Sequence, residues 1–244
     1  MWPIFIKEVR TVFSDTIGFL AIGLFLTLSA LFLWLLEGSF NIIQAGFADL
    51  TLFFELAPWL LFLVVPTLSM RSFSEEIKLG TLELMLTKPI GVTALVWGKF
   101  LGLLFVGIMA LLPTLGYVYL LHTLLPEGNT LDIGMLWGGY LGLFLFVSML
   151  TALSVLMSSL SRQQTTAFIL ALFVGFSQFY LWGQLANVSA SFYWYDWIAS
   201  IGMQSHYSSL NRGVIRLEDV AYFLGGTLLF LMATQYRIRL LQSQ

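Results

Sequence analysis

The sequence contains no cysteine, and only 10% of its 244 residues carry a charged side chain. The absence of cysteine excludes disulfide bonds, thiolate nucleophiles and cysteine-ligated metal sites. Eleven basic and 13 acidic residues give a formal net charge of −2. The basic residues are scattered along the chain rather than gathered in one stripe, so we expect no binding to nucleic acid.

Motifs of hydrolytic enzymes and nucleotide-binding loops are also missing. The chain has neither the HExxH zinc motif nor the GxSxG nucleophile turn. Gly98 and Lys99 are followed by Phe100, and Thr93 stands where a phosphate-binding loop needs its first glycine. We therefore expect no catalytic residue, no metal ligand and no cofactor in this chain.

Hydrophobic residues make up 59% of the sequence, and the mean hydropathy is +0.89. Charge-free runs of about 20 residues are long enough to cross a bilayer as helices. The predicted fold class is an all-α polytopic membrane protein, with one transmembrane domain over residues 1–244. Its six expected spans cover about 17–36, 50–70, 97–121, 133–160, 167–186 and 220–236.

Two segments are predicted to lie in the membrane interface. Residues 1–15 place apolar side chains at helical spacing with four charges among them, which is typical of an amphipathic interfacial helix. This segment lacks the layout of a signal peptide, so we expect it to be retained. Residues 187–219 mix aromatic and polar side chains, and we expect short outer re-entrant helices there.

Glycines and isolated acids give further expectations about the spans. Gly134, Gly138 and Gly142 recur every fourth residue, so the fourth span is predicted to pack centrally against other helices. Three acids lie near the outer span ends, where solvated anchoring is favoured over a substrate or proton path. These acids are Glu37, Glu55 and Asp219.

The region 72–90 is a polar island between the second and third spans. Ser72 and Glu75 fit a capping box, Gly80 can end a short helix, Thr81 can begin another, and Pro89 can stop it. We therefore expect two short helices. Their shared apolar face would hold Leu82, Met85 and Leu86, leaving Glu76, Lys78 and Glu83 available to a soluble partner.

The distribution of Lys and Arg predicts which side of the membrane this island faces. Six spans place both termini on one side, and one set of loops then holds nine basic residues while the other holds two. The nine are Lys7, Arg10, Arg71, Lys78, Lys88, Lys99, Arg162, Arg237 and Arg239, and the two are Arg212 and Arg216. By the positive-inside rule the island and both termini are cytoplasmic.

The segment FSEEIKLGTLELMLTKPIGVTALVWGKFLG resembles the signature of type-two ABC exporter permeases. That signature runs roughly F-x-E-E-x-x-x-G-T-x-E-L-L-L-T-x-P and is followed by G-K, with Met85 here in place of the usual leucine. Lys7 and Glu8 near the start, LAPW at 56–59 and HYSSLNRGVI at 206–215 resemble the gliding-motility-associated permease subunit of Bacteroidetes.

The resemblance implies a multi-pass permease of the bacterial inner membrane, with an N-terminal interfacial helix, a cytoplasmic coupling helix and short outer helices. Its partners would be a cytoplasmic ABC ATPase dimer, which binds ATP and Mg, and a second permease or a membrane subunit with a large outer domain. Membrane lipid is the remaining expected partner. The residues expected to couple to the ATPase are Glu75, Glu76, Lys78, Gly80, Thr81, Glu83, Met85 and Leu86.

Two other functions stay open at this stage. The chain could be a scaffold that transmits force or guides assembly without moving a solute, because that role needs the same coupling helix. An intramembrane enzyme would have to use His206 with a carboxylate such as Asp196 or Glu218. The spans offer aromatic and small residues without a selective charged cavity, which is compatible with lipid, polysaccharide or peptide as substrate.

Overall fold

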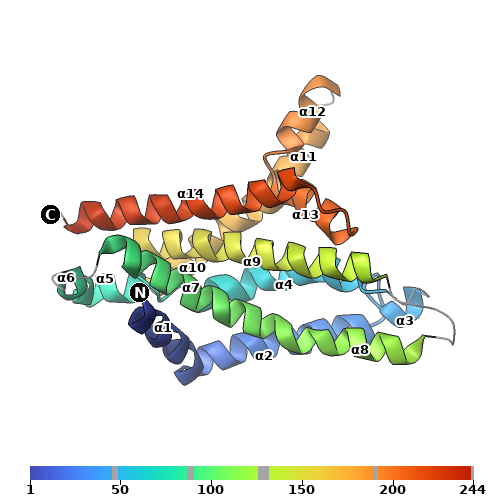
Figure 1. The fold of residues 1–244 in the computed structure, drawn as a ribbon, viewed down its shortest axis with the longest axis horizontal. Helices are drawn as coiled ribbons and strands as arrows, with labels where there is room; N and C mark the ends of the chain where they lie inside the picture. The colour runs from blue at the N-terminus through green and yellow to red at the C-terminus, as the bar shows by residue number, and fades with distance from the viewer. Residues whose placement is uncertain (46–48, 87–90, 126–131, 189–191, 243–244) are drawn as a thin grey trace.

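The structure, a computed structural model, describes residues 1–45, 49–86, 91–125, 132–188 and 192–242 (Figure 1). Within these ranges the chain is helical and contains no strand, which confirms the all-α prediction. Six stretches are long and apolar enough to cross a membrane. They are Thr16–Leu35, Thr51–Lys78, Val92–Thr123, Ile133–Leu160, Gln164–Val188 and Leu217–Gln242.

The elements follow one another in a single bundle. In chain order they are α1 (Trp2–Ser14), α2 (Thr16–Ala30), α3 (Ile42–Ala45), α4 (Thr51–Ser69), α5 (Ser74–Lys78), α6 (Thr81–Leu86), α7 (Val92–Leu111), α8 (Leu115–Leu124), α9 (Ile133–Leu160), α10 (Gln164–Phe176), α11 (Trp182–Val188), α12 (Phe192–Ala199), α13 (Met203–Asn211) and α14 (Leu217–Gln242). A 3-10 turn at Leu112–Thr114 joins α7 to α8 around Pro113, where the missing proline N–H interrupts the helix.

The central helix is α9, as its glycine spacing predicts. Of its most apolar stretch 78% is buried, compared with 22% for the helix that begins at Gln164. A Cβ on Gly139 would approach the ring of Phe54 to 2.4 Å, and one on Gly138 would approach Gly213 Cα to 2.7 Å. The bare glycine surface therefore lets α4 and the end of α13 lie directly against α9.

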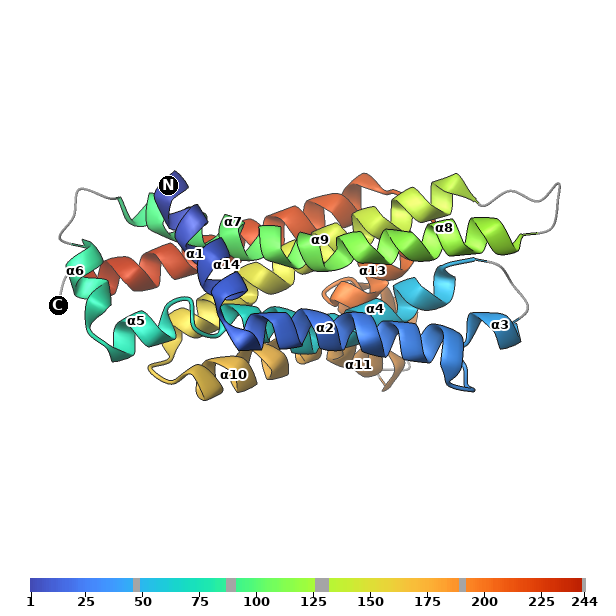
Figure 2. The ribbon, with the colours of Figure 1, turned by 90° about the horizontal axis from the view of Figure 1, so that it is seen from below.

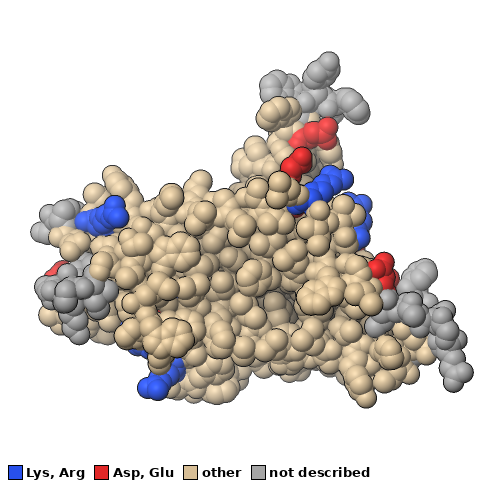
Figure 3. Space-filling model, viewed as in Figure 1, with Lys and Arg blue, Asp and Glu red and all other residues tan. Residues whose placement is uncertain are grey.

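Both chain ends lie at the same end of the bundle, together with α5 and α6 (Figures 1 and 2). The ends of α8 and the short α3 lie at the opposite end, and α12 projects from the side of the bundle (Figure 1). On the face drawn in Figure 3, charged atoms gather towards the two ends and the middle is uncharged. This is the pattern expected for a chain that crosses a bilayer along its long axis.

The last helix is longer than the predicted span. The apolar stretch covers 220–236, whereas α14 runs over Leu217–Gln242 and takes in Asp219, Arg237 and Arg239. Helical hydrogen bonding continues past the apolar part because charged side chains near helix ends can reach the interface. The turn before α10 is shorter than expected, since α9 ends at Leu160 and α10 begins at Gln164.

Candidate functional site

Helix α1 crosses the start of α7 (Figure 2), and two glycines of α7 lie at the contact. A Cβ on Gly98 would lie 2.9 Å from Ile4 Cβ, and one on Gly102 would lie 2.8 Å from Glu8 Cβ. Residues four apart share one face of a helix, so together these glycines form a smooth surface on which α1 rests. This close approach brings Glu8 next to Lys99.

Lys99 is the centre of a buried polar cluster at this crossing. Its ammonium nitrogen lies 2.6 Å from Glu8 Oε1, 2.6 Å from the carbonyl oxygen of Ser72 and 2.9 Å from Glu76 Oε1. Only 1% of the side chain is exposed. An ammonium group has three N–H donors, so these three acceptors satisfy it completely. The ring of Phe73, 4.9 Å from Nζ, packs against the same charge.

The charges in this cluster, Glu8, Glu76, Lys7 and Lys99, balance. Lys7 Nζ lies 2.8 Å from the Glu76 oxygen that also binds Lys99, so two lysines face two glutamates. A buried charge costs several kcal/mol unless it is paired and hydrogen-bonded. The cluster therefore fixes α1, α5 and α7 relative to one another, because separating any one of them would leave a buried charge unpaired.

Further polar contacts hold the turn between α4 and α5. The hydroxyl oxygen of Ser158, near the end of α9, accepts hydrogen bonds from the backbone N–H groups of Phe73 (3.0 Å) and Ser74 (3.1 Å). The same hydroxyl donates to the carbonyl oxygen of Met70 at 2.9 Å. A side chain from another span thus satisfies the first N–H groups of α5, which would otherwise be buried without partners.

Arg71 connects this turn to two more spans. Its guanidinium forms an ion pair with Asp15, the residue that caps α2, and its Nε lies 3.1 Å from Gln164 Oε1 at the start of α10. The turn after α4 and the short helix α5 are therefore joined through side chains to α1, α2, α7, α9 and α10. Movement of α5 cannot occur without moving or breaking these contacts.

The predicted capping box at Ser72 is wrong. The first residue of α5 is Ser74, its N-cap is Phe73, and the cap makes no side-chain hydrogen bond. The Ser72 hydroxyl is buried and has no hydrogen-bond partner in the described part of the chain. The distant Ser158 supplies the cap instead, which local sequence spacing could not indicate.

The prediction that Glu76 is available to a partner is also wrong. Glu76 is buried and bound by both lysines, so it belongs to the interior of the site. Glu75 is half-buried and lines a cavity of about 300 Å³ beside α1. Lys78 and Glu83 are exposed, as predicted, on the two short helices.

The turn between α5 and α6 contains the glycine that was predicted to end the first short helix. Gly80 has a φ of +68°, the left-handed conformation that glycine adopts without strain, and α6 begins at Thr81. Leu82 is buried and Met85 packs on the core. The side chain of Leu86, and Lys88 and Pro89 with their expected roles, lie outside the described residues.

Sequence reasoning missed the importance of Lys99 and Glu8. Glu8 was named only in the resemblance of the N-terminal segment to a permease subunit. Lys99 was named only in the comparison with a phosphate-binding loop, in the count of basic residues and in the G-K of the permease signature. The available signal was Gly98-Lys99 with Gly102 at helical spacing, which places a charge inside a tight helix crossing.

A second polar cluster lies at the other end of the bundle, between α13 and α14. His206 Nδ1 lies 2.7 Å from Asp219 Oδ1, and His206 Nε2 lies 2.9 Å from the carbonyl oxygen of Ser200. Ser209 donates a hydrogen bond to the other oxygen of Asp219. Asp219 is buried, so the expectation that it is a solvated anchor is wrong, whereas Glu37 and Glu55 are exposed.

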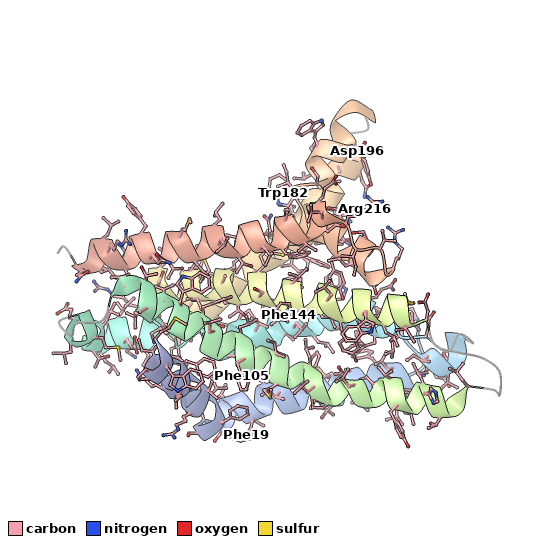
Figure 4. The ribbon with its side chains drawn as sticks, in the orientation of Figure 1. Phe19, Phe105, Phe144, Trp182, Asp196 and Arg216 are labelled. Carbon is pink, nitrogen blue, oxygen red and sulfur yellow. The ribbon has the colours of Figure 1, made fainter. Side chains whose placement is uncertain are left out.

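The enzyme alternative expected His206 to pair with a different carboxylate. The partner of His206 is Asp219, not Asp196 or Glu218, and Asp196 lies on the projecting helix α12 (Figure 4). His206 is thus held between a carboxylate of α14 and a backbone carbonyl oxygen. Among the described residues no group of three or more metal-ligating side chains is found. The cluster thus acts as a link between α13 and α14.

Comparison with known proteins places the chain in a family. The profile of a protein family described as ABC-2 family transporter protein matches residues 2–237, nearly the whole chain. No curated protein matches the chain.

Proposed function

The chain belongs to the ABC-2 transporter family and is a transmembrane permease subunit of an ABC transporter, and we propose that it couples ATP hydrolysis by a separate ATPase subunit to transport or force across a bacterial inner membrane. The partner ATPase would bind ATP and Mg and would contact α5 and α6. The observation that carries this proposal is the buried Lys99 cluster directly behind those two helices.

The cluster supports coupling because it makes α5 part of a rigid unit. Lys78 and Glu83 are exposed on α5 and α6, while Glu76, between them and the bundle, is held by Lys99. A partner that pushes on the exposed side chains therefore displaces α7 and α1 as well. Packed interiors transmit such displacements between discrete arrangements rather than absorbing them.

The orientation of the protein is part of the proposal. The end of the bundle with both termini also carries α1, α5 and α6, and with them Lys7, Arg10 and Lys78. Basic residues near span ends favour the cytoplasmic side. A cytoplasmic ATPase dimer would reach two permeases there, either two copies of this chain or one copy and a membrane subunit with a large outer domain.

A role in gliding motility is the narrower proposal. It is supported by the resemblance of LAPW at 56–59 and HYSSLNRGVI at 206–215 to the gliding-associated permease subunit. These two segments meet in space, since Trp59 and Tyr207 line the same outer groove. Side chains from both segments therefore contribute to one surface at the outer end.

The test of coupling is copurification of the ATPase from detergent-solubilised membranes. We expect Glu83→Arg, which reverses an exposed charge on α6, to lower copurifying Mg-ATP hydrolysis about tenfold or more. Gly80→Pro should do the same, because proline cannot adopt the positive φ of that turn. The matched control is Glu37→Arg, an exposed charge at the other end. Undiminished ATPase recovery and activity with both α5–α6 variants would refute the proposal.

A further inference from the structure

A groove of about 510 Å³ opens at the outer end of the bundle, between α4 and α13 and far from the coupling helices. Its wall combines aromatic rings with polar side chains in a volume typical of small-molecule sites. The residues that matter for its chemistry are Glu55, Trp59, Gln204, Tyr207, Asn211 and Arg212.

The aromatic wall is rigid. The hydroxyl of Tyr207 donates a 2.6 Å hydrogen bond to the carbonyl oxygen of Phe54, and burial, with a contribution from the Glu55 carboxylate, raises the pKa of this hydroxyl. Trp59 packs edge-on against Phe179 and Tyr180, with ring centres 5.7 and 5.9 Å away. The rings are thus fixed in position without any ligand.

The groove contains two opposite charges that are not paired with each other. Glu55 is exposed in the second turn of α4, inside a candidate span, and Arg212 is exposed at the end of α13. Neither forms an ion pair with any residue that the structure describes. The Arg212 Nε donates to the carbonyl oxygen of Ser208 at 3.1 Å, which orients the guanidinium but leaves its charge uncompensated.

The side-chain oxygen of Asn211, which also lines the groove, lacks a hydrogen-bond partner in the described chain. Asn211 is 5% exposed, and its Oδ1 makes no hydrogen bond within the described chain. A buried amide oxygen without a donor costs about 1–3 kcal/mol. A carboxylate near a membrane span is also costly unless something compensates it. The groove therefore presents an exposed carboxylate and an exposed guanidinium, which a ligand carrying both charges would pair together.

We propose that this groove binds a zwitterionic phosphoethanolamine head group, with its primary ammonium at Glu55 and its phosphate at Arg212. The ammonium supplies N–H donors for a carboxylate, and the guanidinium matches a phosphate. Trp59 and Tyr207 cover the ethyl segment between the two charges. Phosphatidylethanolamine presents this group at the membrane surface, where the outer end of α4 lies.

Other membrane ligands fit the groove less well. A neutral saccharide would leave both charges uncompensated, and phosphatidylglycerol would bring its phosphate to Arg212 but offer no cation to Glu55. Phosphatidylcholine carries a cation without N–H groups, so it cannot donate a hydrogen bond to the carboxylate. The proposal does not depend on ATPase coupling, because it concerns the opposite end of the bundle.

The experiment is native mass spectrometry of the purified chain titrated with phosphatidylethanolamine, phosphatidylglycerol or phosphatidylcholine in detergent. We expect phosphatidylethanolamine to bind about tenfold or more tightly than either of the others. Glu55→Gln should abolish this preference, and Arg212→Gln should weaken binding of all three phospholipids about tenfold. The matched controls Glu37→Gln and Arg216→Gln, which change exposed charges outside the groove, should bind as the wild type does.

Competition with a soluble head group distinguishes recognition of the head group alone from recognition of the intact lipid. Competition by glycerophosphoethanolamine assigns binding to the head group alone, whereas retained lipid binding without competition assigns it to the intact lipid. Equal binding of all three phospholipids, or an unchanged preference in Glu55→Gln with a normal elution volume, would overturn the proposal. Glu83→Arg should leave lipid binding unchanged, so failure of ATPase coupling is distinguishable from failure of this site.

Discussion

At the scale of single residues, the ammonium of Lys99 suits its site better than any other cation would. Its three N–H donors meet three acceptors from α1, the turn after α4, and α5. A planar guanidinium directs its donors in one plane and would leave at least one of these acceptors unsatisfied. Lysine at this position therefore combines charge balance with the geometry of a three-way junction.

Replacing Lys99 with methionine should destabilise the protein strongly. Lys99→Met leaves Glu8 and Glu76 buried next to each other, and removing one partner of a buried ion pair costs about 3–5 kcal/mol. The measurement is the free energy of unfolding in detergent micelles. The control is Lys7→Met, whose side chain is 48% exposed and whose loss should cost about 1 kcal/mol or less. Equal stability of the two variants would contradict the central role of Lys99.

The sequence predicted the composition of this site only in part. Glu76 was identified as a coupling residue, but its burial depends on Lys99, 23 positions away, and on α1. The contact between Lys99 and Glu8 spans 91 positions, so no local pattern could reveal it. Residue types indicate which charges exist, whereas the crossing of α1 over α7 decides which of them meet.

At the scale of elements, α1 lies across α7 and is held there by helix packing and by one ion pair. Gly98 and Gly102 have no side chains, so the backbones of α1 and α7 lie close together. Glu8 of α1 then reaches Lys99 of α7 and forms an ion pair with it. Any side chain at either glycine would lift α1 and lengthen that ion pair. The glycines thus control the electrostatics of the site through packing.

Gly102→Leu should detach α1 from α7. A Cβ there would lie 2.8 Å from Glu8 Cβ, and overpacking of this kind costs about 1–3 kcal/mol. We expect faster amide hydrogen exchange in α1 and α5, with little change in α14, because α1 and α5 share the Lys99 cluster. The matched control is Gly225→Leu on α14, where no atom lies within 4 Å of the added Cβ. If exchange in α1 is the same in both variants, the glycine contact does not position this helix.

The elements themselves were largely predictable, and their irregular ends were not. Apolar runs predicted the six long helices because each run satisfies its own backbone hydrogen bonds. Gly80 predicted the break between α5 and α6 because a positive φ is a local property. The N-cap of α5 was wrongly predicted because Ser158 of α9 provides it, and Asp219 was wrongly left in solvent because His206 and Ser209 bind it from α13.

At the scale of the whole molecule, the two ends of the bundle have different chemistry. The end with α1, α5 and α6 has a charge-balanced ion-pair cluster around the buried Lys99, and exposed charges near it. The opposite end has Glu55 and Arg212 unpaired within the described chain, in an open groove with aromatic walls. The first arrangement suits transmission of movement, and the second suits binding of a ligand.

Because the two ends differ, measuring the orientation of the molecule in the membrane tests the proposed coupling to a cytoplasmic ATPase. Because the chain has no cysteine, a single introduced cysteine is its sole thiol. We expect a membrane-impermeant maleimide added to intact spheroplasts to label Glu37→Cys, beyond the first span, but to label Lys78→Cys on α5 only after lysis. Both residues are exposed, so accessibility of the side chain itself is matched. The reverse pattern would place α5 and α6 outside the cell, where no ATP-driven subunit could act on the Lys99 cluster.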